Sequence, residues 1–160
     1  MIKLIFLCAT LAFPNKDTLP NQLPLLQPIR QADFKYISSK YGWRIDPITK
    51  DSTFHEGIDI ATTGTNAAVY ATADGIVETL DYDKKRGLFI ILNHSFGFQT
   101  QYYHLGNFFI RKGQSVKAGE KIGLVGNTGK STAEHLHYEV LFEGVAINPL
   151  DLQVLKIKDL

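Results

Sequence analysis

Apolar residues along the chain gather in short runs, and turn residues separate these runs at short intervals. Segments such as GIVETL at residues 75–80 and LFIILNH at residues 88–94 are rich in β-branched and aromatic side chains, which favour strands. Glycines at turn-like spacing interrupt the pattern, namely Gly75, Gly87, Gly97, Gly113 and Gly119. Many short strands joined by turns are typical of antiparallel proteins. The chain is therefore expected to be mainly β, with a sandwich or open barrel-like core.

One segment predicts a short helix on the N-terminal side of the folded region. Within residues 33–40, Phe34 and Ile37 are three positions apart, and Tyr41 follows four positions later. This is the spacing of one face of a helix. Elsewhere helical periodicity is scarce.

The chain divides into four segments by composition. An apolar run from Leu4 to Phe13 follows Lys3; it suits the core of a secretory signal peptide and is too short to span a bilayer. A buried N-terminal strand is the alternative, but the Pro-, Gln- and Asn-rich sequence that follows favours the signal peptide. The expected division is a signal peptide over 1–13, a linker over 14–33, one folded domain over 34–150 and a tail over 151–160.

Charge, hydropathy and cysteine content narrow the functional classes. The chain has 17 basic and 16 acidic residues and no marked run of Lys or Arg, so a nucleic-acid partner is not expected. No apolar run reaches ~18 residues, so no transmembrane span is expected. Cys8 is the single cysteine and lies in the expected signal peptide, so a mature domain would have no cysteine at all. Any metal site there must use His, Asp and Glu.

The stretch AEHLHYEV at residues 133–140 carries the first candidate chemistry. Side chains alternate between the two faces of a strand, so His135, His137 and Glu139 would share one face. The apolar residues between them would share the other face and suit a core. Three ionisable groups side by side are costly to bury, and a bound cation would satisfy them.

A second stretch, FHEGIDIA, places His55 four residues before Asp59. A strand or a helix would put both on one face, and Gly57 beside β-branched residues favours the extended form. A third histidine-bearing run, TQYYHL, contributes His104, ten residues after His94, which is interpreted as structural.

Each of these pieces is weak alone, because an H-x-H pair in a strand is more often packed or solvated than metal-bound. Together they supply nitrogen and carboxylate donors with imidazoles to spare. Three protein ligands with an open fourth position are the arrangement of a catalytic zinc.

Taken in order, these blocks resemble the lysostaphin-type (LytM-like) zinc metallo-endopeptidases, which cut the peptide part of bacterial peptidoglycan. The matching text covers about residues 40–149 and comprises YGWRIDPITK, HEGIDIA, ATADGIVE, HSFGFQTQYYHL, KAGEKIGLVGNTGKS and HLHYEV. Several blocks in the right order are far more specific than any single motif. The resemblance implies that His55, Asp59 and His137 ligate zinc, and that His104 and His135 are catalytic.

The function that the resemblance implies is a zinc-dependent endopeptidase that hydrolyses peptide cross-links of peptidoglycan with a metal-activated water. Its substrate would be the stem peptides of the wall, in the periplasm or outside the cell, and a regulatory protein partner is left open. Two alternatives stay open as well: a non-catalytic envelope regulator of the same fold that activates a wall amidase, and a zinc- or wall-binding module without turnover. Occupation of all five motif positions argues against the regulator.

Two departures from the family pattern lie near the expected site. A Gly-Pro pair often precedes the family's H-x-H, whereas this chain has Ala133 and Glu134. The loop GTNAAV at residues 64–69 reads as a small insertion relative to the family's G-T-P-V. Neither departure touches an expected ligand, so both bear on specificity more than on activity.

Several neighbours of these motifs have two interpretations each. Glu139 would either hydrogen-bond a ligand imidazole or be a solvated strand residue. Arg44 and Asp46 would either brace a loop as an ion pair or contact substrate, and the ion pair is favoured. Trp43 and Phe54 are interpreted as packing residues rather than recognition residues.

Overall fold

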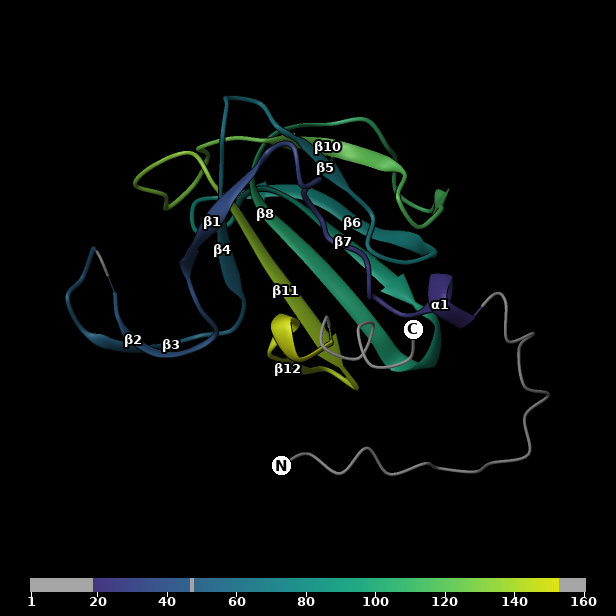
Figure 1. The fold of residues 1–160 in the computed structure, drawn as a ribbon, viewed down its shortest axis with the longest axis horizontal. Helices are drawn as coiled ribbons and strands as arrows, with labels where there is room; N and C mark the ends of the chain where they lie inside the picture. The colour runs from purple at the N-terminus through teal and green to yellow at the C-terminus, as the bar shows by residue number, and fades with distance from the viewer. Residues whose placement is uncertain (1–18, 47, 153–160) are drawn as a thin grey trace.

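The computed structural model describes residues 19–46 and 48–152. A short helix, α1 (Leu19–Gln22), precedes a series of strands that pair antiparallel throughout (Figure 1). The strands are β1 (Phe34–Ser39), β2 (Gly42–Ile45), β3 (Ser52–His55), β4 (Ile58–Thr62), β5 (Ala68–Tyr70), β6 (Gly75–Asp83), β7 (Gly87–His94), β8 (Phe98–Phe108), β9 (Ser115–Val116), β10 (Lys121–Val125), β11 (Leu136–Phe142) and β12 (Val145–Ile147). A 3-10 turn, η1 (Ser95–Gly97), joins β7 to β8. The predicted mainly antiparallel β class is confirmed.

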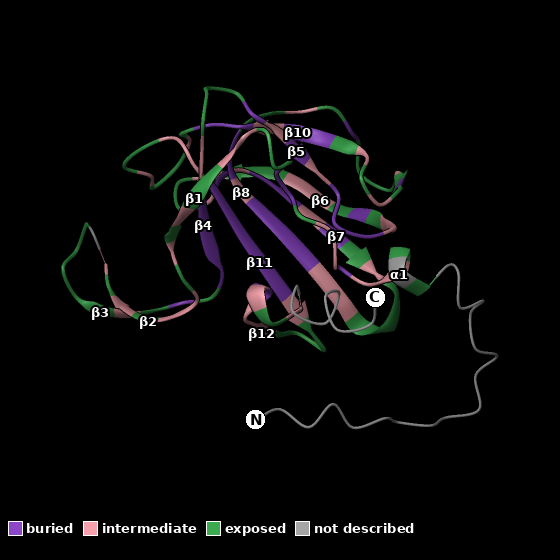
Figure 2. Cartoon of the chain, in the orientation of Figure 1, coloured by how far each residue is buried: buried purple, intermediate pink, exposed green. Residues whose placement is uncertain are grey.

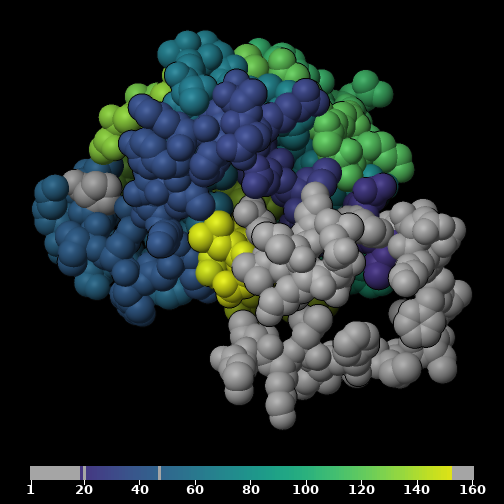
Figure 3. Space-filling view, in the orientation of Figure 1, coloured from purple at the N-terminus to yellow at the C-terminus, as the bar shows by residue number. Residues whose placement is uncertain are grey.

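Ten of these strands form one sheet, whose central path runs β1-β4-β11-β8-β7-β6-β9. β10 pairs with both β8 and β5, and β12 pairs with β11. The hairpin β2–β3 stands apart as a two-stranded sheet at one side of the molecule (Figure 1). The space-filling view shows it as a lobe at the left edge of the surface (Figure 3).

The core lies along the middle of the sheet, where most of β11 and the central part of β8 are buried (Figure 2). β11 alternates as its sequence predicts, because Leu136, Tyr138 and Val140 are 0%, 2% and 0% exposed on the core face. The largest fully buried side chains of the described residues are Tyr102, Tyr138, Phe89, Ile29, Ile58, Ile90, Leu92, Leu105, Ile122 and Leu136.

The helix predicted over residues 33–40 is wrong, because this segment is strand β1, paired with β4. The pairing shifts register between Phe34 and Tyr36 and again between Ile37 and Ser39. Such bulges interrupt the alternation of a strand. They place Phe34 and Ile37 on the partly buried side three positions apart, which is the spacing that imitates a helix.

A chain of hydrogen bonds links β7, β8 and β11 within the core. His94 Nδ1 donates to the carbonyl of Asp74 at 2.8 Å, and its Nε2 lies 2.7 Å from the Thr100 hydroxyl. Thr100 contacts Tyr102 at 3.0 Å, and the network continues through a buried threonine, Thr72, to Tyr138. His94 is therefore held by core partners, in agreement with its structural interpretation.

The described part of the expected linker runs against the sheet. The carbonyl of Pro28 accepts a hydrogen bond from Tyr70 N–H at 2.9 Å, and Ile29 is 1% exposed. The division into linker, domain and tail stays a prediction, and the expected signal peptide lies outside the described residues. No helix within the described ranges has the length and apolar character to cross a membrane.

Candidate active site

Three strands bring the expected metal ligands together. His55 is the last residue of β3, Asp59 lies in β4, and His137 lies in β11. The pairing of β4 with β11 sets Asp59 directly opposite His137. The extended form predicted around His55 and Asp59 is interrupted at residues 56–57, where the chain passes from β3 to β4.

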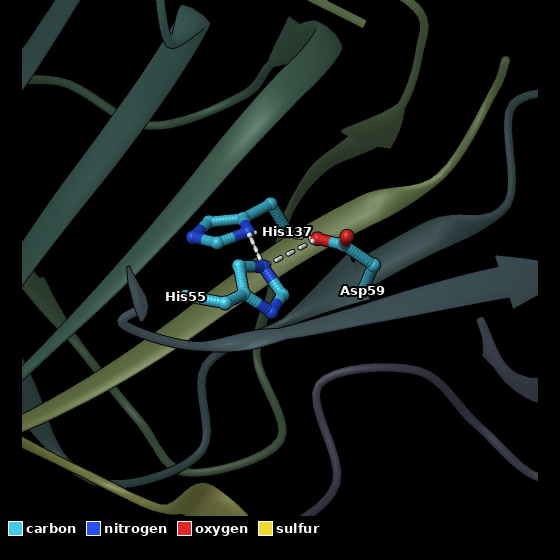
Figure 4. Close-up of side chains that lie close together, drawn as sticks. All are labelled: His55, Asp59 and His137. Atoms are coloured by element: carbon cyan, nitrogen blue, oxygen red, sulfur yellow. Dashed lines mark hydrogen bonds and ion pairs between the residues drawn. The ribbon is translucent and has the colours of Figure 1, made fainter. Parts of the chain in front are cut away.

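The three side chains point at one another, as Figure 4 shows. His137 Nδ1 lies 2.8 Å from Asp59 Oδ1 and 3.0 Å from His55 Nε2. His55 Nε2 lies 3.2 Å from the same carboxylate oxygen. All three residues are less than a tenth exposed, at 5%, 8% and 9% for His55, Asp59 and His137.

A second partner fixes the tautomer of each ligand histidine. The carbonyl of Lys40 accepts from His55 Nδ1 at 2.8 Å, and Glu139 Oε1 accepts from His137 Nε2 at 2.8 Å. Since carbonyl and carboxylate oxygens only accept, these ring nitrogens carry the protons. When a ring is neutral, its other nitrogen presents a lone pair toward Asp59 Oδ1; when the ring is protonated, that nitrogen donates to the same oxygen. With both rings neutral, three acceptors converge on one point, and a metal ion in place of the ring protons would satisfy them together.

The charges of this cluster follow from the same contacts. Burial raises the pKa of Asp59, but hydrogen bonds from His137 and His55 outweigh it and hold that pKa well below its usual range. Burial lowers the pKa of His137, but its bonds to Asp59 and Glu139 raise the pKa to about 9. The cluster thus keeps an ionised carboxylate at its centre.

His104 reaches the cluster through a bulge in β8. Ile90 pairs with Tyr102 and Leu88 with Leu105, so two residues of β8 oppose one of β7. His104 has φ +62°, a left-handed conformation that non-glycine residues seldom adopt. A bulge re-aims the side chains of a strand, and here both Tyr103 and His104 line the same cleft.

His104 and His135 are oriented in the same way as the ligand histidines. The carbonyl of Thr128 accepts from His104 Nδ1 at 2.8 Å, and that of Ala133 accepts from His135 Nδ1 at 2.8 Å. Their ring centroids lie 4.8 Å apart, and His135 Nε2 is 3.6 Å from Asp59 Oδ1. Burial lowers the pKa of His104 to about 4, so its ring is neutral near pH 7.

These side chains line one cleft of about 410 Å³. Hairpin β2–β3 forms one wall, and the turn between β6 and β7 contributes to the other. Lys130 Nζ lies 3.0 Å from Asp46 Oδ2 and links the loop before β11 to the hairpin. The lining residues are Arg44, Asp46, Ile48, Thr53, Phe54, His55, Glu56, Asp59, Lys85, Arg86, Tyr103, His104, Lys130, Ser131, Thr132, His135, His137 and Glu139.

Comparison with known proteins assigns the family. The family model described as "Peptidase family M23" matches residues 53–149, which is more than half of the chain. This chain belongs to peptidase family M23.

Relatives with similar sequences are named as DD-endopeptidases or as combined DD-carboxypeptidase/endopeptidases. The chain is 36% identical over 124 residues to peptidoglycan DD-endopeptidase ShyC of Vibrio cholerae, covering 76% of this chain and 28% of ShyC. It is 39% identical over 116 residues to DD-carboxypeptidase/endopeptidase Mpg of Neisseria meningitidis, covering 72% of this chain and 26% of Mpg. The chain thus spans less than a third of the length of these two relatives.

Solved M23 structures share the fold. A zinc-containing peptidase from Vibrio cholerae has a TM-score of 0.71 and 35% identity over 77% of this chain and 38% of its own. The catalytic domain of lysostaphin from Staphylococcus simulans has a TM-score of 0.67 and 28% identity over 76% of this chain and 92% of its own. The resemblance to lysostaphin-type peptidases is therefore confirmed.

The donor set of this M23 chain fits zinc, the metal of the family. Zinc takes imidazole and carboxylate ligands at about 2.0–2.2 Å, so three donors near 3 Å from one another can share one ion. His55 Nε2, His137 Nδ1 and Asp59 Oδ1 meet that condition, and a bound ion would displace the proton from a protonated ring. The oxygen and nitrogen donors also match the metal's preference without any cysteine.

The structure decides between the two interpretations given for Glu139, Arg44 and Asp46. Glu139 is 7% exposed and bonded to His137, so it is not a solvated strand residue. The favoured Arg44–Asp46 ion pair is wrong, because Arg44 Nη2 lies 3.5 Å from Asp59 Oδ2 while Asp46 pairs with Lys130.

The packing interpretation is also wrong for Trp43, which is 75% exposed and touches Phe54 edge-on at 5.6 Å. The two stretches expected to depart from the family pattern meet at one contact, because the Asn66 N–H donates to Glu134 Oε1 at 2.6 Å. The loop that contains Asn66 is thereby tied to the segment that leads into His135. The sequence did not predict this contact, because Asn66 and Glu134 are 68 residues apart in the chain.

Proposed function

We propose that this chain is a zinc-dependent endopeptidase that hydrolyses peptide cross-links of bacterial peptidoglycan. The observation that carries the proposal is the convergence of three possible metal-ligand atoms from His55, Asp59 and His137 in a cleft that also contains two oriented imidazoles. The named activities of ShyC and Mpg support a bond between D-amino acids as the target.

In this proposal His55, Asp59 and His137 hold the metal. Bound zinc would polarise the scissile carbonyl and lower the pKa of water, which is otherwise a poor nucleophile for an amide. Lys40 and Glu139 keep the two ligand imidazoles in the tautomers that the metal requires. Tyr103 stacks on the His137 ring at 5.1 Å and restricts its rotation.

His104 and His135 handle protons in the proposed reaction. Each donates through Nδ1 to a backbone carbonyl, so each neutral ring offers Nε2 as an acceptor. One ring accepts the proton of the attacking water, and a ring so protonated can donate to the oxyanion or the leaving amine. The two centroids are 4.8 Å apart, which lets both act on one reacting group.

The wall substrate implies an extracytoplasmic location, and we propose the periplasm or the cell exterior. A non-catalytic regulator of the same fold is the second candidate. The intact set of five histidine and aspartate side chains in an open cleft favours the enzyme, because a protein-binding role would need none of them oriented.

Digestion of purified peptidoglycan tests the proposal. We expect mass spectrometry to detect muropeptides released by cleavage of cross-links, loss of release with a chelator, and recovery with added zinc. His104→Ala should lower the rate at least ~100-fold, while retaining zinc. Release that persists unchanged in the chelator, or no release by the zinc-loaded chain, would contradict the proposal.

A further inference from the structure

Arg44 lines the cleft, and within the described residues most of its side-chain N–H donors have no hydrogen-bond acceptor. It lies in β2, where alternation turns Trp43 and Ile45 outward to 75% and 62% exposure. Arg44 itself lines the cleft, and its side chain is 29% exposed. Among the residues that the structure describes, its Nε is the buried side-chain nitrogen or oxygen left without a hydrogen-bond partner.

The contact of Arg44 with Asp59 does not satisfy these donors. A guanidinium has five N–H donors in a planar fork. Only Nη2 is near a carboxylate, and its 3.5 Å to Asp59 Oδ2 exceeds the roughly 2.7–2.9 Å of a charge-assisted hydrogen bond. Asp59 Oδ1 meanwhile faces the histidines. The fork therefore retains donors for another anion.

The other cations of the cleft are engaged or solvated. Arg86 Nε lies 2.6 Å from Asp83 Oδ2, and its guanidinium covers the Phe89 ring at 3.6 Å. Lys130 pairs with Asp46 at 3.0 Å. Lys85 is exposed on the turn between β6 and β7. Arg44 is the cation beside the ligand cluster that is both partly buried and incompletely bonded.

We propose that Arg44 binds the free α-carboxylate of the amino acid on the leaving side of the scissile bond. The inference rests on the proposed function and specifies its substrate. Arg44 contacts Asp59, so its guanidinium lies next to the ligand cluster, where the scissile carbonyl would be placed. A carboxylate bound by Arg44 would then belong to the next amino acid of the substrate, because successive α-carbons are only ~3.8 Å apart. The substrate of a carboxypeptidase always has a free α-carboxylate on the amino acid that leaves. Mpg is named as both a carboxypeptidase and an endopeptidase, and one carboxylate-binding residue would serve both activities.

Paired substrates test this assignment. We would compare the kcat/KM of the zinc-loaded chain on two DD-cross-linked muropeptide dimers, in which the residue after the scissile bond has an α-carboxylate or an α-carboxamide. The wild-type chain should prefer the carboxylate at least about tenfold, because the amide cannot form the charge-assisted fork. Arg44→Gln should bring the ratio close to one, and Arg44→Lys should give an intermediate ratio.

Arg111→Gln serves as the matched control, since Arg111 is exposed and lies outside the cleft. Its ratio should equal that of the wild type. A wild-type ratio near one would overturn the proposal. So would an Arg44→Gln variant that loses zinc and loses rate equally on both substrates, because Arg44 would then act only through Asp59.

Calorimetry separates this inference from the proposed function. The probes are N-acetyl-D-alanyl-D-alanine and its carboxamide, titrated into the zinc-loaded wild type and into Arg44→Gln. Tighter binding of the carboxylate by the wild type alone supports the inference even if no wall cross-link is cut. Equal binding of both probes overturns it even if the cross-links are cut.

Discussion

At the scale of the residue, the orientation of each histidine in the cleft is set by the acceptor that its second ring nitrogen bonds to. His55, His104 and His135 each donate to a backbone carbonyl, and His137 donates to Glu139. These acceptors decide which nitrogen faces the cleft, and therefore whether a ring can bind a metal or accept a proton. Through the resemblance, the sequence showed which histidines to expect, and it offered Glu139 as a partner of one ligand imidazole. It did not show the backbone carbonyls that hold the other three rings.

Glu139 should strengthen metal binding through His137, because an anionic acceptor makes the opposite nitrogen a better donor to a cation. We expect Glu139→Gln to weaken zinc binding roughly 10–100-fold, measured by competition with a chromogenic chelator. Glu78→Gln is the control, since Glu78 is exposed and pairs with Gln99 away from the cleft. Equal zinc affinity in Glu139→Gln and wild type would show that the His137–Glu139 bond has no such effect.

At the scale of the element, bulges and close approaches place the site. The bulge in β8 turns His104 into the cleft beside Tyr103, although strict alternation would send it toward the core. The connection from β3 to β4 passes so close to β11 that only glycine fits at position 57. A Cβ there would meet the Tyr138 carbonyl oxygen and lie 2.8 Å from Glu139 Cγ.

Gly57→Ala should therefore destabilise the fold by ~1–3 kcal/mol, because β4 must move away from β11 to admit the methyl group. Urea denaturation followed by circular dichroism measures the free energy of unfolding. Gly64→Ala is the matched control, since nothing lies within 4 Å of its Cβ position, and it should change stability by less than about 0.5 kcal/mol. Equal effects of the two substitutions would mean that the approach at Gly57 is not restrictive.

The same elements show what the sequence could and could not predict. Strict alternation in β11 correctly separated the core side chains from His137 and Glu139. In β1 the bulges broke that alternation, so Phe34 and Ile37 imitated a helix. Arg44 was misjudged for a different reason: its partner Asp59 is on another strand, and the sequence offered Asp46 two positions away.

At the scale of the whole molecule, His94 couples stability to pH. Burial lowers the pKa of His94 below its usual value of 6.5, although the Asp74 carbonyl and the Asp74 charge, itself paired with Lys117, act in the opposite direction. A group whose pKa is lowered by folding takes up its proton more readily in the unfolded chain. Its contribution to stability is complete above pH 6.5 and is lost as the pH falls.

We expect the free energy of unfolding to decrease between pH 7.5 and pH 5.5, and part of that decrease to be absent in His94→Gln. The difference between the two proteins isolates His94, because the other titrating groups are common to both. Urea titrations at several pH values provide the measurement. A wild-type curve parallel to that of the variant, or a stability that rises on acidification in the wild type alone, would refute this coupling.

The central claim is that His55, Asp59 and His137 together hold one zinc ion, while His104 acts beside it. Metal content of zinc-equilibrated, desalted protein, measured by mass spectrometry of the metal, tests it most directly. The account predicts about one zinc per chain in the wild type and in His104→Ala, and almost none in folded Asp59→Ala. A full complement of zinc in Asp59→Ala, or none in the wild type, would contradict it.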